Sequence, residues 1–167
     1  MKHQSDILAL KYRPTDFKDL IGQEYLVETI QKSIEQNKIP NAYIFTGIRG
    51  VGKTTTARIV AKMLNCTAFD QNNRPDLDNC DQAKAISEDR HPDVIEIDAA
   101  SNTSVENARE IIENVKYNPV LGKYKVYIID EVHMLSKSAF NALLKTLEEP
   151  PPHSKFIFAT TEISKVP

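Results

Sequence analysis

One segment of the chain has the residue types and spacing of a phosphate-binding loop. Residues 47–54 read Gly-Ile-Arg-Gly-Val-Gly-Lys-Thr and match G-x-x-x-x-G-K-[ST] at every fixed position. Glycines let such a loop wrap tightly with its N–H groups turned inward, and the start of the following helix adds the positive end of its dipole. We expect Lys53 to reach the β- and γ-phosphates and the Thr54 hydroxyl to bind magnesium. The motif predicts that ATP and Mg²⁺ are the cofactors, held by Gly47, Gly50, Val51, Gly52, Lys53, Thr54 and Thr55.

A second motif places two acids directly after an apolar run. Residues 126–129 are Val-Tyr-Ile-Ile, and Asp130 and Glu131 follow. In proteins with a phosphate-binding loop a neighbouring strand delivers an acid to the magnesium shell, and Asp130 fits that role. Glu131 is then the candidate general base that polarises the attacking water, as a hydrolase requires. The alternative interpretation is a strand end that carries two solvated acids.

A third signal is the pair of threonines after the apolar run 156–159. A hydroxyl at the carboxyl end of a central strand can sense the γ-phosphate or hold the water, and we assign this role to Thr161. Threonine is common at strand ends, so this assignment depends on the two motifs before it. The candidate catalytic residues are therefore Glu131, Lys53 and Thr161.

Four short apolar runs are expected to position these motifs. The runs 94–97, 126–129 and 156–159 are almost continuously apolar, as in strands covered on both faces of a parallel sheet, and the run 43–45 precedes the glycine-rich loop. Helical patterns alternate with them. This order predicts an α/β fold with a mostly parallel, doubly wound sheet flanked by helices. Because the chain ends near the fourth core strand, we expect an unfinished sheet edge there.

The helical patterns are apolar residues spaced three or four apart, around 26–34, 57–64, 105–115 and 140–147. Thr103 and Glu106 have the spacing of a capping box, which predicts the start of the third helix. Three prolines at 150–152 end the fourth. The segment 67–79 is polar, and we expect it to be a surface insertion.

The composition is that of an ordinary globular protein, with 167 residues, 41% hydrophobic and 26% charged. We therefore expect one domain, 1–167. The net charge of −2 supplies no general attraction to nucleic acid, so such contacts would be local or shared with partners. We find no apolar stretch of the roughly 20 residues that a membrane helix needs and no signal-peptide pattern, and we expect a cytoplasmic protein. Two cysteines do not make a disulfide scaffold.

With these motifs in place, the chain resembles the AAA+ ATPases. More narrowly, it is similar to the N-terminal ATPase domain of the bacterial DNA polymerase III gamma/tau family, the motor subunits of the sliding-clamp loader. The likeness covers nearly the whole chain. It depends on Lys-Tyr-Arg-Pro at 11–14, Glu-Ile-Asp-Ala-Ala-Ser at 96–101, Asp-Glu-Val-His-Met-Leu at 130–135 and Leu-Glu-Glu-Pro-Pro at 147–151. Replication factor C small subunits share only the last of these stretches.

The resemblance implies an ATPase that loads the sliding clamp onto primed DNA during DNA replication. It implies that Lys53 and Thr54 bind phosphate and magnesium, that Asp130 binds the metal, and that Thr161 occupies the sensor-1 position. The residues implied around the adenine are Tyr12, Arg13, Pro14 and Ile21. The implied partners are the other clamp-loader subunits, the sliding clamp and primer-template DNA, the last through backbone contacts.

This sequence departs from the family in two ways. The family usually has four zinc-binding cysteines after the helix of the phosphate loop, but here Cys66 and Cys80 alone are present, with Arg74 and Leu77 at the middle positions. Structural zinc takes four ligands, so we expect no zinc. The family's Ser-Arg-Cys motif and its lid and collar domains do not occur within 1–167. We therefore expect a domain truncated at its C-terminal edge that is monomeric and nearly inactive alone.

Three other functions are weighed against the clamp-loader ATPase. An AAA+ branch-migration helicase would share both acidic and phosphate-loop motifs, but residues 140–151 argue against it. A non-catalytic clamp-loader subunit is disfavoured because Lys53, Thr54, Asp130 and Glu131 are all present. A small-molecule kinase would need an acceptor site and a lid, and we find neither pattern.

Overall fold

The computed structural model describes residues 7–11, 28–46, 51–101 and 104–166, with the backbone alone for 7–11 and 51–55. Residues 28–35 are helical. The elements that follow or precede them are β1 (Ile7–Lys11), β2 (Ala42–Thr46), α2 (Val51–Asn65), α3 (Asp81–Ser87), β3 (Val94–Asp98), α4 (Val105–Val115), β4 (Lys125–Asp130), α5 (Lys137–Glu148) and β5 (Ser154–Thr160). Three short 3-10 helices are η1 (Leu77–Asn79), η2 (Val132–Met134) and η3 (Ile163–Lys165).

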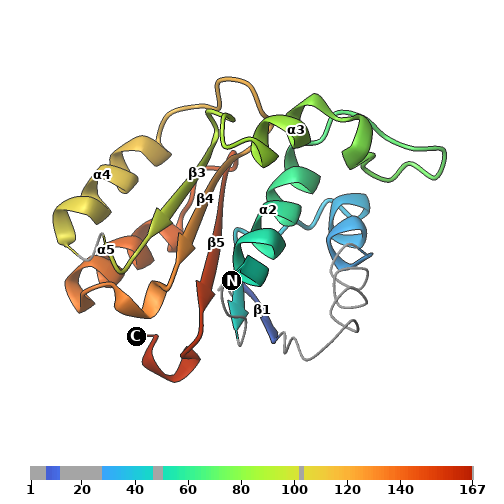
Figure 1. Ribbon diagram of the computed structural model, residues 1–167. Helices are drawn as coiled ribbons and strands as arrows, with labels where there is room; N and C mark the ends of the chain where they lie inside the picture. Colours follow the sequence, from blue (N-terminus) through green and yellow to red (C-terminus); the bar gives the residue numbers. More distant parts are fainter. Residues whose placement is uncertain (1–6, 12–27, 47–50, 102–103, 167) are drawn as a thin grey trace.

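The strands form one parallel sheet in the order β1-β2-β5-β4-β3 (Figure 1). This confirms the predicted α/β class and the parallel sheet. The last strand is not itself an edge of the sheet, because β5 lies between β2 and β4 and every one of its residues is buried. In this order the last strand enters the middle of the sheet, so the edges are β1 and β3.

Within the described residues the sheet has five strands, where four were expected. All four predicted runs are strands, each one to three residues longer than the run. The additional strand is β1, which pairs with β2 from Ile7 to Lys11. Its sequence, Ile-Leu-Ala-Leu-Lys, shows no strict alternation of apolar and polar residues, so the pairing with β2 is what identifies it as a strand.

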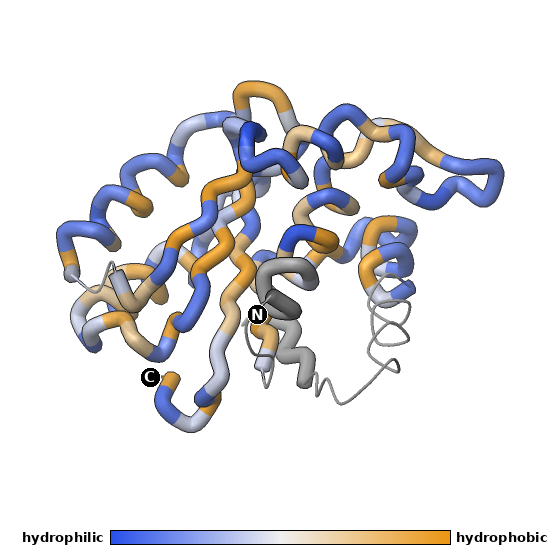
Figure 2. Tube along the Cα trace, in the orientation of Figure 1, coloured by the Kyte–Doolittle hydropathy of each residue, from blue (hydrophilic) through white to orange (hydrophobic). Residues whose placement is uncertain are grey.

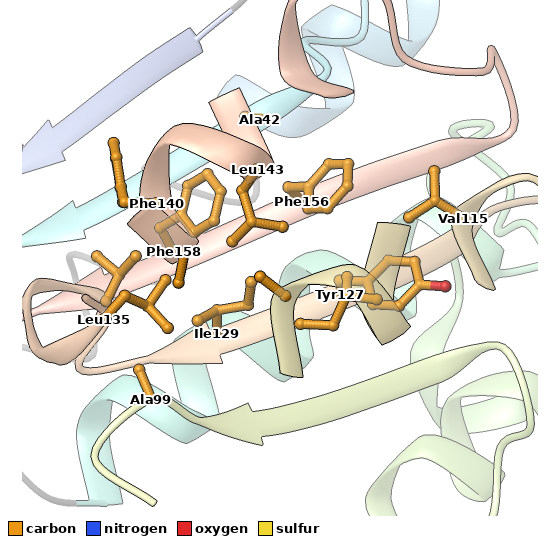
Figure 3. Packing of buried hydrophobic residues seen from close by; sticks show 14 residues of the cluster. Ala42, Ala99, Val115, Tyr127, Ile129, Leu135, Phe140, Leu143, Phe156 and Phe158 are labelled. Carbon is orange, nitrogen blue, oxygen red and sulfur yellow. The ribbon is translucent and has the colours of Figure 1, made fainter. Parts of the chain in front are cut away.

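Helices cover both faces of the sheet (Figure 1). Alternate residues of each strand point to opposite sides, because side chains in a strand have a period of two. Val126 and Ile128 of β4 pack against α2, whereas Tyr127 and Ile129 pack against α4 and α5. Figure 3 shows this second cluster, in which the rings of Tyr127 and Phe156 stack with centroids 5.5 Å apart. Burial on both faces explains why the central strands are continuously apolar, as Figure 2 also shows.

The predicted helices are present, but one predicted cap was wrong. The structure starts α4 at Val105 with Ser104 as N-cap, whose Oγ accepts a hydrogen bond from the Asn107 N–H at 3.3 Å. Thr103, to which the capping box with Glu106 was assigned, lies outside the described residues, and the N-cap is the serine that follows it. Ser, Thr, Asp and Asn all cap well, so the motif alone does not decide between neighbouring hydroxyls. The short helix α3 was not predicted.

The segment 67–79 lies at the surface, in line with the predicted insertion. It forms a narrow turn closed by a bridge between Phe69 and Pro75 and projects from the body of the molecule beside α3 (Figure 1). Asp70 stabilises the turn by accepting hydrogen bonds from the N–H groups of Asn72 and Arg74. Among the described helices, none is long and apolar enough to cross a membrane.

Candidate active site

The start of α2 lies at the carboxyl edge of the sheet, where a phosphate-binding loop must be (Figure 1). The strand β2 ends at Thr46 and α2 begins at Val51. Gly47 and Gly50 lie outside the described residues. Val51, Gly52, Lys53, Thr54 and Thr55 form the first turns of α2, although their side chains are outside the described part. A helix start at the end of a parallel strand presents N–H groups and positive dipole to an anion.

Asp130 faces a cavity that α2 helps to form. The cavity has a volume of about 240 Å³ and is lined by Ala57 of α2, Ala159 of β5, Ile128 and Asp130 of β4, and Glu96, Ile97 and Asp98 of β3. Ala57 lies three residues after Thr54, so the carboxylate and the first turns of this helix border the same space. The strand register places Asp98 directly beside Asp130. The carboxylates of Asp98 and Asp130 thus line the same cavity as α2, the helix whose first turns contain the predicted metal ligand Thr54.

Glu96 is an acid of this cavity that already has a strong partner. The guanidinium of Arg58 on α2 binds it through two hydrogen bonds of 2.5 and 3.1 Å and also binds Asp89 at 2.5 Å. The hydrogen bond to Glu96 is the main reason why the pKa of Arg58 is raised, although partial burial opposes it. The pair connects α2 to the edge strand β3. Glu96 therefore supports the wall of the cavity through its ion pair with Arg58.

Glu131 follows β4 in a conformation that few residues adopt. Its φ is 53° and its ψ is 47°, in the left-handed region that costs free energy for a residue with a Cβ. The turn is stabilised by a 3.0 Å hydrogen bond from the Glu131 N–H to Asp130 Oδ1. Strained backbone of this kind is concentrated at functional sites.

The predicted residues Glu131 and Thr161 are in contact. Thr161 Oγ1 donates a hydrogen bond of 3.2 Å to Glu131 Oε2. Thr161 directly follows β5, the strand that lies between β2 and β4. Two residues separated by 30 positions in sequence thus meet at one edge of the sheet.

Three side chains beside Glu131 were not selected from the sequence as site residues. His133 Nδ1 lies 2.8 Å from Thr160 Oγ1, while His133 Nε2 lies 3.4 Å from Glu131 Oε2 and 3.6 Å from Glu162 Oε2. The sequence shows that a histidine follows the acid pair, but not that it turns back toward β5. The 3-10 helix η2 produces that turn.

The residues predicted around the adenine cannot be placed in the same way. Tyr12, Arg13, Pro14 and Ile21 all lie outside the described residues. Their assignment therefore remains a prediction from the resemblance.

The two cysteines pack together at the base of the insertion. Cys66 and Cys80 are buried and contact Ala83, with Leu77 packed against them. Cys66 Sγ lies 3.1 Å from the carbonyl oxygen of Ala68, and burial raises the pKa of this thiol to about 12. Burial alone would also raise the pKa of Cys80, but hydrogen bonds from Cys66 and nearby backbone N–H groups lower it overall, so only one thiol of the pair is shifted toward the thiolate that zinc binds. Within the described part of the chain, no group of three or more His, Cys, Asp or Glu side chains could hold a metal ion.

Comparison with known proteins places these features in a family. The family model described as "DNA polymerase III, delta subunit" matches residues 22–167. The match includes both the glycine-rich loop and the acid pair.

Curated relatives carry related names. The DNA polymerase III subunit tau/gamma of Haemophilus influenzae is 51% identical over 161 residues, which is 96% of this chain and 23% of the relative. The subunit tau of Escherichia coli is 51% identical over 162 residues, covering 96% and 25% of the two chains. The subunit tau of Bacillus subtilis is 51% identical over 156 residues, covering 93% and 27%. The chain therefore spans about a quarter of the length of these relatives.

Proposed function

We propose a function from the premise that this chain belongs to the DNA polymerase III delta-subunit family and is about half identical to gamma and tau subunits. We infer that it is the AAA+ nucleotide-binding part of a clamp-loader motor subunit. It binds and hydrolyses ATP, and the cycle loads the sliding clamp onto primed DNA during DNA replication. The relatives' names favour this function over a branch-migration helicase.

One observation carries the ATPase proposal. The acid pair Asp130–Glu131 ends a central strand, and Asp130 lines one cavity with Ala57 of the helix that begins with the phosphate-loop residues. In open parallel sheets ligands bind outside the carboxyl ends of the strands. A non-catalytic subunit would not need both Asp130 and Glu131. Nor would it need the Thr161 hydroxyl that donates a hydrogen bond to Glu131.

The residues divide the reaction between them. Backbone N–H groups at the start of α2 and the Lys53 ammonium bind the phosphates, and Thr54 and Asp130 hold magnesium. The metal, when bound, neutralises charge on the β- and γ-phosphate oxygens. Glu131 accepts a proton from the attacking water, and Thr161 orients that carboxylate. The side chain of Asp130 also accepts the Glu131 N–H, which keeps the two acids in fixed relation.

The wider setting follows from the same family. We propose that the chain acts in the cytoplasm with other clamp-loader subunits, a sliding clamp and primer-template DNA, which it contacts through the phosphate backbone. The net charge of −2 is consistent with DNA contacts that are shared among subunits.

The first test concerns nucleotide binding. Lys53→Ala should abolish ATP binding, because backbone N–H groups alone cannot neutralise the γ-phosphate. Lys62→Ala is the matched control, because it removes a lysine from the last turn of the same helix. Calorimetric titration with ATP and Mg²⁺ distinguishes the two. Unchanged affinity in Lys53→Ala would show that the nucleotide site has been misassigned.

The second test separates binding from chemistry. Glu131→Gln in the assembled loader should bind ATP as the wild type does but hydrolyse it about 10²–10⁴-fold more slowly, because the general base is lost and the metal ligand is kept. Glu148→Gln, at the end of α5, is the control. Single-turnover hydrolysis and ATP titration measure the two effects. If binding and turnover fell together, Glu131 would have to be a metal or structural residue.

A further inference from the structure

We propose that His133 is a positioning residue for Glu131, held by Thr160 through Nδ1 and orienting the Glu131 carboxylate through Nε2. This inference rests on the proposed role of Glu131 as general base. His133 itself would touch neither the nucleotide nor the attacking water.

The side chain of His133 is fixed in one place. It is 7% exposed, although it belongs to the short helix η2 immediately after the acid pair. Its Nδ1 lies 2.8 Å from Oγ1 of Thr160, the last residue of β5, which is fully buried. The imidazole therefore connects the end of β5 with the segment that carries Glu131.

The hydrogen bonds around Thr160 determine which ring nitrogen carries the proton. Thr160 Oγ1 already accepts the backbone N–H of Glu162 at 3.0 Å. Its own O–H must be donated because the group is buried, and among the described contacts of this hydroxyl the acceptor within reach is His133 Nδ1. Nδ1 therefore accepts, and in the neutral ring the proton resides on Nε2.

The Nε2–H group of the neutral His133 ring faces two carboxylates. It lies 3.4 Å from Glu131 Oε2 and 3.6 Å from Glu162 Oε2. These distances are longer than a normal hydrogen bond, so the interaction is an electrostatic attraction that the N–H shares between two acceptors. Thr161 Oγ1 donates to the same Oε2 of Glu131. Two donors from different elements thus meet one oxygen of the proposed base.

This convergence matters because proton transfer depends steeply on geometry. The backbone of Glu131 is in the left-handed region, and the donors His133 and Thr161 meet its carboxylate at one oxygen. A displacement of about 1 Å in a reacting group can cost roughly 10²-fold in rate. Loss of His133 should therefore slow hydrolysis while ATP binding, which depends on other residues, is kept.

Two substitutions separate the contacts of the ring. His133→Asn keeps a polar atom where Nδ1 lies and contacts Thr160, but it does not reach Glu131. His133→Gln reaches toward the carboxylates. In the full protein assembled with its partner subunits, we expect single-turnover hydrolysis to fall about 10- to 100-fold in His133→Asn and less in His133→Gln, with unchanged ATP affinity in both. The control is His153→Asn, because His153 binds the Val115 carbonyl oxygen near the opposite end of β5.

A double-mutant cycle distinguishes positioning from a purely structural role. In a Glu131→Gln background, His133→Asn should cause no further loss of rate, because the group on which it acts is gone. An equal loss of rate in both backgrounds would overturn the proposal. It would also be overturned if the wild type were active and His133→Asn hydrolysed ATP at the same rate. A wild-type assembly that binds no ATP would instead refute the proposed function.

A measurement that needs no ATPase activity tests the same geometry. Nitrogen NMR of this chain with labelled histidine should show His133 as the tautomer protonated on Nε2, and Thr160→Val should alter its Nδ1 signal. Observation of the tautomer protonated on Nδ1 would overturn the proposal, whether or not the chain is shown to be an ATPase.

Discussion

The carboxylate of Asp93 is a buried charge that holds a loop in place. It is 1% exposed and accepts hydrogen bonds from the backbone N–H groups of Val120, Leu121 and Gly122 at 2.6, 2.7 and 2.5 Å. Burial alone would raise the pKa of Asp93, but the three N–H donors and nearby His91 lower it overall. The loop fixed in this way presents Val120 and Leu121 to solvent.

Asp93→Asn should destabilise the protein by about 2–3 kcal/mol, because a neutral amide cannot accept three N–H groups in the place of a carboxylate. Asp78→Asn, at an exposed position of η1, is the control. Urea unfolding at neutral pH measures the difference. Equal stability of the two variants would show that the three hydrogen bonds contribute nothing net.

The same residue gives a pH dependence whose sign is defined. The folded-state pKa lies below the ordinary 3.8, so the unfolded chain binds the proton more tightly. The stabilisation by Asp93 is present above pH 3.8 and is lost as the pH falls through the folded-state pKa. The unfolding free energies of wild type and Asp93→Asn should therefore approach each other as the pH falls further below 3.8.

At the scale of elements, each α/β unit is positioned by its termini as well as by its apolar face. Ser104 caps α4 and Ser136 caps α5, the latter through a 3.1 Å hydrogen bond from the Ala139 N–H. The helix α5 follows η2 directly, so the cap at Ser136 also ends the segment that carries Glu131 and His133. Helix caps therefore contribute to the position of the acid pair.

The corrected cap of α4 can be tested directly. Ser104→Ala should cost about 1 kcal/mol of unfolding free energy, because the Asn107 N–H loses its acceptor. Thr103→Ala, the residue that the motif suggested, should cost less. Thermal or urea unfolding of both variants decides between them. A larger loss in Thr103→Ala would restore the predicted capping box.

At the scale of the whole molecule, the insertion 67–79 closes on an apolar contact. Cys66 and Cys80 bring its two ends together, and Leu77 packs beside them. Burial in this contact raises the pKa of the Cys66 thiol to about 12. Apolar packing thus closes the insertion at its base.

Elemental analysis of the purified protein should therefore find no stoichiometric zinc, and added chelator should leave its unfolding temperature unchanged. The physical reason is that Arg74 and Leu77 replace two thiolates and tetrahedral zinc needs four ligands. Cys66→Ser is a useful companion, because it should destabilise the packed cluster without any effect of chelator. One zinc per chain would contradict the prediction.

The sequence by itself determined the fold class, and it supplied the phosphate-loop and acid-pair motifs on which the proposed chemistry depends. Those features are local: a glycine-rich turn before a helix and an apolar strand before two carboxylates are defined by consecutive residues. The same holds for the apolar runs of β2, β4 and β5, the central strands that are buried on both faces.

Only the tertiary structure decided the strand order, the strand β1, the N-cap at Ser104 and the contacts of Glu131. Strand pairing, and the contacts between residues about 30 positions apart, depend on how elements pack, which a linear pattern does not encode. His133 is the clearest case, because its type and place in sequence are visible. Its contact with Thr160 exists only because β5 lies beside β4.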